Sequence, residues 1–413
     1  MPRPLRYAAA AVLLAAASLL TSTGAEVIAQ DPPTGRVRVD PNLSGKDPFA
    51  ARAARTARPV LEPAQKQEQE GEAEVAPPAR QAAFKDALFL RGQTEPTVGE
   101  VLSISGAEGV VLSFDGKTRT YPLGTVERVE IEVTEEFRRG VGAFALGETS
   151  GAQSQFNKAL ELFQQARRQS PRRLEKEWAT AKIVETYSAL GRDDEAVSEF
   201  FILCRLDPYS VYLPSAPLRW LNQTTLNRGS SADAKQLAET SAAEWLKLAD
   251  NPSGKLNPTG RLVAASYLLH SSNYGKDALD AIRGLVVLEP PDGASDDLAD
   301  ACKTISLLAS AQLWRDAVLR KPTEREVARW KQTLELLPAE TKLGPLTLVA
   351  IGEKSLGLDE QGAEDFLRVY ALGSRQFSLA EVAAKEAADA FERLKKHDAA
   401  RQIRADAEAR FHN

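Results

Sequence analysis

Cysteine, histidine and methionine are scarce in this chain of 413 residues, which holds two cysteines, three histidines and one methionine. The two cysteines, Cys204 and Cys302, are too few for a disulfide framework or a cysteine-rich metal site. The sequence also lacks an HExxH motif, a glycine-rich phosphate loop and paired-cysteine spacing. We therefore expect no cofactor and no bound metal.

The histidines give little support to a catalytic reading. His412 lies one residue from the end of the chain, and His397 lies in a predicted turn between two helices. His270 is left as the one candidate for a catalytic triad, and a solvent-facing histidine explains it better. We expect no enzymatic activity and no catalytic residues. A hydrolase on a helical scaffold is the less favoured alternative.

The composition is that of a protein with a sizeable core. Hydrophobic residues make up 43% of the chain, charged residues make up 26%, and the net charge is −5 at pH 7. A chain of this length has room for two or three domains. No clustered basic face is evident, so nucleic acid is not an expected partner.

Residues 1–25 have the three-part layout of a secretory signal peptide. Arg3 and Arg6 precede the apolar run Tyr7–Leu20, and Thr23–Ala25 supplies small residues for cleavage. A retained membrane anchor is the alternative, but it needs about 20 apolar residues. We predict export from a bacterial cell, a periplasmic or secreted protein, and no stable membrane span after cleavage.

Residues 26–85 show no sustained apolar periodicity. Eight prolines interrupt this stretch, and Gln65–Glu74 is rich in glutamine and glutamate. Such a segment buries too little apolar area to offset the entropy lost on ordering. We predict a disordered linker. A basic arm that contacts an anionic surface is an alternative for its first half, where five arginines gather.

Composition changes at Asp86, where short apolar runs alternate with turn residues until residue 134. The runs are Ala87–Arg91, Val98–Ser105, Gly109–Phe114, Thr118–Leu123 and Val126–Val133. Their period of two predicts strands, and Asp115-Gly116 predicts a hairpin. We expect a small closed or nearly closed five-stranded β-barrel. The layout resembles SH3-like and Sm-like barrels, which implies peptide or glycan contact, although a structural cap on the next domain is the favoured role.

From residue 135 to 413 the apolar period becomes helical, and Glu177–Ser210 is its most regular stretch. Leu190-Gly191 predicts the end of one helix, and the small Ala196 predicts a close crossing with the next. Pro208 ends the second helix. This spacing resembles one tetratricopeptide repeat, a helix–turn–helix unit of about 34 residues. The resemblance implies a mostly α fold, a tetratricopeptide-like α-solenoid preceded by the small β-barrel.

Other stretches resemble the repeat less closely. A first unit from Glu135 carries a polar insert at Glu148–Ser154, and Thr259–Asp292 and Glu381–Asn413 form later units. The last unit has Lys395 where a glycine usually ends the first helix. Since each stacked unit contacts mainly its neighbours, two buried thiols are favoured over a bond between Cys204 and Cys302.

Family geometry implies that the first helix of each unit lines a concave face. Trp178 and Glu185 form a candidate peptide anchor there, although packing of Trp178 on the preceding unit is an equal alternative. The other candidate partner-binding residues on this face are Tyr267, His270, Lys385, Asp389 and Arg393. A carboxylate clamp is absent because Ala181 and Glu185 occupy the equivalent places, which argues against capture of a chaperone tail.

These observations lead to two functional hypotheses of different classes. The first is an exported non-enzymatic scaffold whose concave face binds other envelope proteins or extended peptides. The second is a structural or assembly factor that self-associates through barrel and solenoid to form a homo-oligomer. The sequence favours the first hypothesis.

Overall fold

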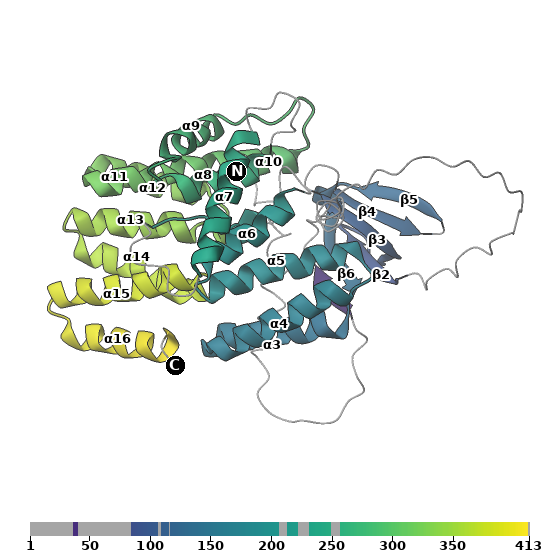
Figure 1. Ribbon diagram of the computed structural model, residues 1–413, viewed down its shortest axis with the longest axis horizontal. Helices are drawn as coiled ribbons and strands as arrows, with labels where there is room; N and C mark the ends of the chain where they lie inside the picture. The colour runs from purple at the N-terminus through teal and green to yellow at the C-terminus, as the bar shows by residue number, and fades with distance from the viewer. Residues whose placement is uncertain are drawn as a thin grey trace, which may run out of the picture.

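The computed structural model describes residues 36–39, 84–105, 109–114, 116–205, 213–221, 231–248 and 257–411. The predicted signal peptide and most of the predicted linker lie outside these residues. An antiparallel sheet comes first, and a mostly helical region follows (Figure 1). The sheet lies at one end of the helices, with β5 on the side away from them.

Five strands lie between residues 86 and 132, as the alternation of apolar residues predicts. They are β2 (Asp86–Leu90), β3 (Thr97–Ser105), β4 (Gly109–Phe114), β5 (Lys117–Tyr121) and β6 (Val126–Glu132). Gly116 has φ of 71°, the left-handed conformation that the predicted hairpin requires. One face of the sheet is buried, with Leu88, Ile104 and Leu112 fully inaccessible to solvent.

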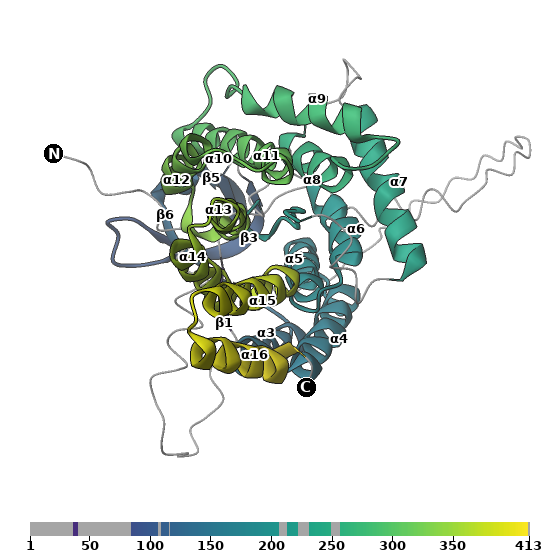
Figure 2. The ribbon, with the colours of Figure 1, turned by 90° about the vertical axis from the view of Figure 1, so that its left-hand side faces the viewer.

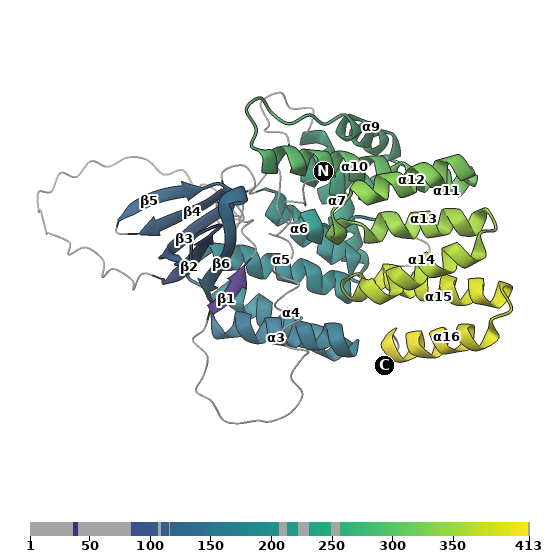
Figure 3. The same ribbon diagram turned by 180° about the vertical axis from the view of Figure 1, so that it is seen from behind.

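The sheet is open rather than closed into a barrel. Its strand order is β1-β6-β2-β3-β4-β5, and within the described residues β5 pairs with β4 and β1 pairs with β6. The predicted barrel closure is therefore not confirmed. β1 (Arg36–Val39) lies inside the stretch predicted to be an irregular linker (Figure 3). Its alternating Arg-Val sequence is the strand signal that the linker prediction missed.

A buried ion pair joins the sheet to the helices. Asp86 at the start of β2 is fully buried, and Arg172 before α5 is 5% exposed. Arg172 Nη2 lies 2.5 Å from Asp86 Oδ2, and Arg172 Nη1 also donates to the Glu132 carbonyl at 2.7 Å. The Asp86 carboxylate accepts from the backbone N–H of Val101 at 2.8 Å and of Glu132 at 2.9 Å. One carboxylate thus links strands β2, β3 and β6 to the helical region.

Further contacts complete the same joint. Glu175 is 1% exposed and accepts from the backbone N–H of Thr134 at 2.8 Å and from the Ser170 hydroxyl at 2.6 Å. On the other side of the sheet end, the N–H of Gly124 donates to Asp297 Oδ2 at 2.8 Å. The sheet therefore contacts helices from two separate parts of the chain.

The helices begin at residue 135. They are α3 (Glu135–Ser150), α4 (Gln153–Gln169), α5 (Arg173–Ala189), α6 (Asp193–Cys204), α7 (Ala232–Leu248), α8 (Pro258–Leu268), α9 (Gly275–Val286), α10 (Asp296–Gln312), α11 (Trp314–Arg320), α12 (Glu324–Leu336), α13 (Leu343–Ser355), α14 (Asp359–Leu372), α15 (Phe377–Arg393) and α16 (His397–Phe411). The predicted insert after α3 is wrong, since helix continues through Ser150 and resumes at Gln153. Cys204 and Cys302 are both buried.

The most regular predicted unit is confirmed as the pair α5 and α6. Gly191 has φ of 69° in the turn, and the N–H of Arg192 donates to the Tyr187 carbonyl at 2.9 Å. This bond closes the last turn of the helix in a Schellman motif. Ala196 is fully buried at the helix crossing, as its small side chain predicts.

Viewed end-on, the helices follow one another around a closed path (Figure 2). α15 and α16 return beside α3, α4 and α5, so the last helices neighbour the first. α5, α8 and α13 carry buried residues on all sides. Helices that are buried all round lie inside an assembly rather than on its surface. We call the sides of α5, α8 and α13 that face one another the inner face (Figure 2).

The turn between α15 and α16 repeats the backbone of the α5–α6 turn with a less suitable residue. Lys395 has φ of 58°, and the N–H of Lys396 donates to the Phe391 carbonyl at 2.9 Å. A side chain in this left-handed region costs about 1 kcal/mol. Lys395→Gly should therefore raise the free energy of unfolding by about 0.5–1 kcal/mol, measured by urea denaturation. Gly191→Ala is the matched control and should lower it, because a Cβ there would lie 3.0 Å from Phe377 Cδ1. Equal effects of the two changes would contradict this account.

The Asp86–Arg172 pair generates a second prediction. Asp86→Ala leaves the Arg172 guanidinium buried without its carboxylate, which typically costs about 3–5 kcal/mol. Thermal unfolding of Asp86→Ala should show that loss. The double variant Asp86→Ala, Arg172→Met should recover part of it, since neither charge is then left uncompensated. Additive losses in the double variant would show that the pair does not act as a unit.

Candidate functional site

We call residues 213–221 the inner segment. They lie between α6 and α7 in the chain, and they pack against the inner face. A short 3-10 turn spans Leu213–Ser215, and the residues after it have no helix or strand. Leu213, Ala216 and Trp220 are each less than 8% exposed. Pro214 and Pro217 favour an extended backbone. The segment therefore resembles a peptide bound to the helices.

Arg219 makes the main polar contacts of the inner segment. Its Nη2 lies 3.4 Å from Asp194 Oδ1, and its Nη1 donates to the Tyr267 carbonyl at 3.3 Å. The guanidinium carbon lies 3.9 Å from the centre of the Tyr267 ring. The backbone N–H of Arg219 donates to the Ser266 hydroxyl at 3.2 Å. Carboxylate, carbonyl and aromatic face together match a planar guanidinium better than an ammonium.

Tyr267 belongs to the same cluster. Its hydroxyl donates to Asp194 Oδ1, and its side chain is buried. Burial raises the pKa of the Tyr267 phenol above its ordinary value, and the neighbouring Asp194 charge adds to the rise. Tyr267 is thus a neutral donor that holds the carboxylate under Arg219. The sequence predicts that Tyr267 contacts a partner. In the structure Tyr267 contacts Arg219 of the same chain.

Trp220 fits against the backbone of α13. Its Nε1 lies so close to Gly344 that a Cβ there would be 2.1 Å away. Only glycine leaves room for the indole at this point. The indole and Gly344 thus form a notch whose shape depends on one missing side chain.

Glu185 contacts the start of the inner segment. The Ser215 hydroxyl donates to Glu185 Oε1 at 2.8 Å, and Lys182 Nζ lies 2.6 Å from Oε2. Burial acts to raise the pKa of Glu185, but the charges of Lys182 and Arg375 outweigh it and hold the pKa below its ordinary value. Glu185 therefore stays ionised where it contacts the inner segment.

A second arginine lies buried beside this cluster. Arg315 on α11 is 3% exposed and donates to the Ser266 carbonyl at 2.7 Å and to Gln312 Oε1 at 2.9 Å. Burial, with the charge of Arg219, lowers the pKa of Arg315 to about 9. The inner face thus holds two arginines among its helices, and α8 contacts both.

The first and last helices meet at a seam next to this face. The Ser378 hydroxyl on α15 donates to Asp193 Oδ2 at 2.9 Å, and Arg375 Nε donates to Glu148 Oε1 at 2.5 Å. Burial raises the pKa of Asp193 to about 6. The seam is thus a polar closure whose charge changes near neutral pH.

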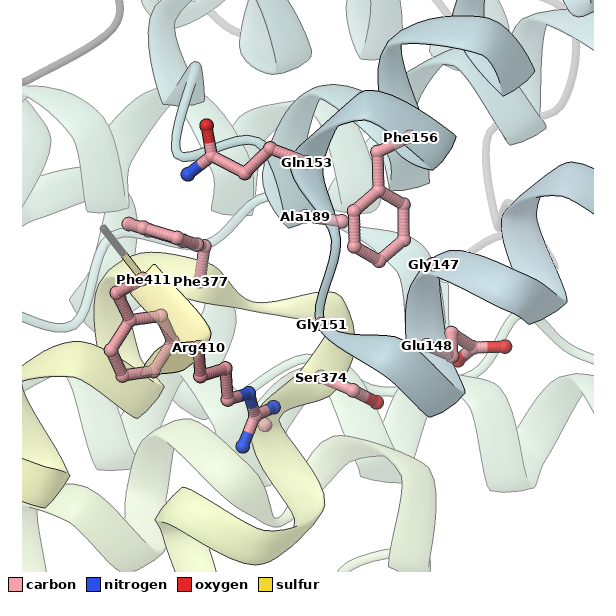
Figure 4. Close-up of a pocket in the computed structure, with 11 residues that line it drawn as sticks. Gly147, Glu148, Gly151, Gln153, Phe156, Ala189, Ser374, Phe377, Arg410 and Phe411 are labelled. Carbon is pink, nitrogen blue, oxygen red and sulfur yellow. The ribbon is translucent and has the colours of Figure 1, made fainter. Parts of the chain in front are cut away.

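A hollow opens along the seam, with about 290 Å³ of space between atoms, open solvent included. Phe156 from α4 faces Phe377 and Phe411 across it, and Glu148 and Arg410 lie at its edge (Figure 4). Arg410 Nη1 donates to the Tyr370 carbonyl at 2.9 Å. On one side of the hollow Phe377 packs on Phe411, with their ring centres 4.8 Å apart. The hollow is therefore a packing feature of the closure.

The structure separates the other predicted partner-binding residues. Trp178 is 5% exposed, and its ring lies 5.9 Å from that of Phe137 on α3. The expectation of an exposed Trp178 is wrong, and the alternative of packing on the preceding unit is confirmed. His270 lies in the turn after α8, and its Nδ1 lies 3.8 Å from Asp316 Oδ1 on α11. Burial and the charge of Arg315 lower the pKa of His270.

Three of the predicted binding residues, Lys385, Asp389 and Arg393, are on α15 and lie apart from Glu185 and Tyr267. Arg404 of α16 lies 3.2 Å from Asp389, and Arg393 lies 2.6 Å from Asp359 of α14. These pairs connect neighbouring helices. Lys385 is exposed two turns along from Ser378, on the same side of α15.

Sequence reasoning missed Ser215, Arg219 and Trp220. They fall in a stretch without apolar periodicity, so the sequence pattern does not indicate which side chains point toward the interior. Pro214 and Pro217 were the available signal, since two prolines three residues apart indicate an extended peptide.

Within the described ranges, no cluster of histidine, cysteine and acidic side chains is arranged to hold a metal ion. None of the helices in those ranges is both long and apolar enough to cross a membrane. A comparison with known protein families, with curated proteins and with solved structures finds no match.

The raised pKa of Asp193 predicts a pH-dependent stability. Its ordinary pKa is 3.8, and its pKa in the folded state is about 6. The folded protein therefore binds this proton more tightly, so stability is lost as pH rises from 4 through 6. Asp193→Asn removes the titration and still accepts from Ser378. Relative to this variant, the wild type should lose about 1 kcal/mol between pH 4 and pH 7.5, after allowance for partial exposure. Parallel curves in pH-dependent urea titrations would contradict the assignment.

Proposed function

We propose that the protein is an exported, non-enzymatic scaffold that binds extended segments of other envelope proteins. In this proposal the helices form a tetratricopeptide-like α-solenoid, and its inner face is the binding surface. The observation that carries the proposal is the inner segment itself. A stretch of polypeptide that begins with a short 3-10 turn and then has no helix or strand lies on this face, and it contacts α6, α8 and α13.

The repeated turns support the solenoid assignment. Gly191, Gly357 and Lys395 all have positive φ and follow the first helix of a pair. In each turn the next residue donates its N–H to a carbonyl five residues earlier, at 2.9 to 3.0 Å. Three helix pairs thus share one local geometry, as stacked repeats do.

Self-association is the second candidate, and a feature of the sheet favours it. β5 lies at an edge of the sheet, and Val98 and Leu102 on β3 are 48% and 43% exposed. β4 lies between β3 and this edge, so Val98 and Leu102 add an exposed apolar surface on the sheet that would suit contact with a second copy. The sheet would then act in assembly and the helices in binding.

One experiment separates the two candidates. A photo-crosslinking amino acid is placed at Ala339, at Leu102 or at Val287, and the cells are irradiated. Ala339 is exposed in a short turn that contacts Leu213–Ser215, and Val287 is an exposed control position directly after α9. The scaffold function predicts discrete adducts with other proteins from Ala339. Self-association predicts adducts at twice the chain mass from Leu102. The scaffold proposal is wrong if Ala339 gives no more adduct than Val287.

A further inference from the structure

The inner segment meets the inner face as a ligand would. Its apolar residues Leu213, Ala216 and Trp220 point into the helices, and Pro214 is exposed. Two hydrogen bonds lie within the segment, from Ala216 to Leu213 and from Leu218 to Ala216. Its polar bonds to the helices come from Ser215 and Arg219. A separate peptide of the same sequence would be able to make all of them.

Two adjacent positions give this surface its selectivity. The Arg219 position is lined by the Asp194 carboxylate, the Tyr267 ring and the Tyr267 carbonyl. The next position is the Gly344 notch, which accepts a flat ring against the helix backbone. An arginine followed directly by an aromatic residue satisfies both, and a lysine lacks the planar fork that the first position suits.

We propose that the inner segment is an internal ligand that occupies the partner site, and that the partner is an extended peptide carrying an arginine followed by an aromatic residue. This inference rests on the proposed function, whose site it specifies. The covalent connection gives the segment an effective concentration on the order of millimolar. A partner peptide therefore has to displace it, and its apparent affinity is its intrinsic affinity multiplied by the fraction of molecules in which the face is free.

The contacts also account for why two of the seven binding residues predicted from the sequence are inaccessible. Glu185 and Tyr267 are 8% and 4% exposed, and both contact the inner segment. Removing the segment would uncover a carboxylate at each end of the path, Glu185 near Ser215 and Asp194 near Arg219. Glu185 would keep its pair with Lys182, whereas Asp194 would lose the Arg219 guanidinium, so the uncovered face would suit a peptide with an arginine at the Arg219 position.

The test uses the full chain and a fluorescein-labelled peptide with the sequence of residues 213–221. In an opened variant, Arg219→Ala with Trp220→Ala, the internal ligand is weakened and the inner face is unchanged. Fluorescence anisotropy should show at least tenfold tighter peptide binding to the opened variant than to the wild type. Adding Gly344→Ala to the opened variant should abolish binding, because the new Cβ fills the indole notch. A peptide with lysine in place of its arginine should bind about tenfold more weakly.

Several results would overturn the inference. One is an opened variant that keeps the wild-type circular dichroism and fails to bind the peptide. Equal binding by wild type and opened variant is another. Arg219→Gln alone is the milder second variant, and unfolding of both variants would show that the segment is part of the core. Peptide binding without cross-links at Ala339 would leave the internal ligand standing and refute the scaffold function. Cross-links without peptide binding would do the reverse.

Discussion

The buried pair of Asp86 and Arg172 is the constraint on which the arrangement of the two regions depends. A charge removed from water is tolerated only when its partners are complete. Here Asp86 receives two guanidinium and two backbone N–H groups, so it can be satisfied in one orientation of sheet against helices. A rotation of the sheet against the helices would leave the charge of Asp86 or Arg172 buried without its partner. The start of α5 is fixed by the same contacts, and the path of the following helices begins from there.

From the start of α5 the helices follow a curved path, and the last helices, α15 and α16, lie beside the first (Figure 2). α5 and α8 lie inside the path, and α13 lies near its middle, so most of their residues are buried, charged ones such as Glu175, Glu185 and Glu353 included (Figure 2). This curved arrangement leaves an inner face that the helices alone would expose to water. The chain covers part of it with its own extended segment. Arg219 and Trp220 thus replace hydration of the inner face with specific contacts.

Local chemistry was predictable from the sequence, and distant packing was not. The turn at Gly191, the crossing at Ala196 and the strands after Asp86 follow from neighbouring residues, and all three predictions are confirmed. The inward direction of Glu185 and Tyr267 followed from the repeat spacing. The burial of Trp178 depended on Phe137, and the position of Arg219 depended on Asp194 and Tyr267. Such contacts join residues whose separation carries no periodic signal, and sequence patterns do not reveal them.

The seam between the first and last helices has a consequence for how the molecule forms. Arg375 and Glu148 are 227 positions apart in the chain, yet they share a hydrogen bond. A stack of repeats can fold outward from any unit, since each unit contacts mainly its neighbours. Closure adds contacts of long sequence separation, which are slow to form because their loop entropy is lost first. During synthesis, the contacts of α3 and α6 with the C-terminal helices can form only after those helices have been made. Closure then joins the two ends of the helical region into one cooperative unit.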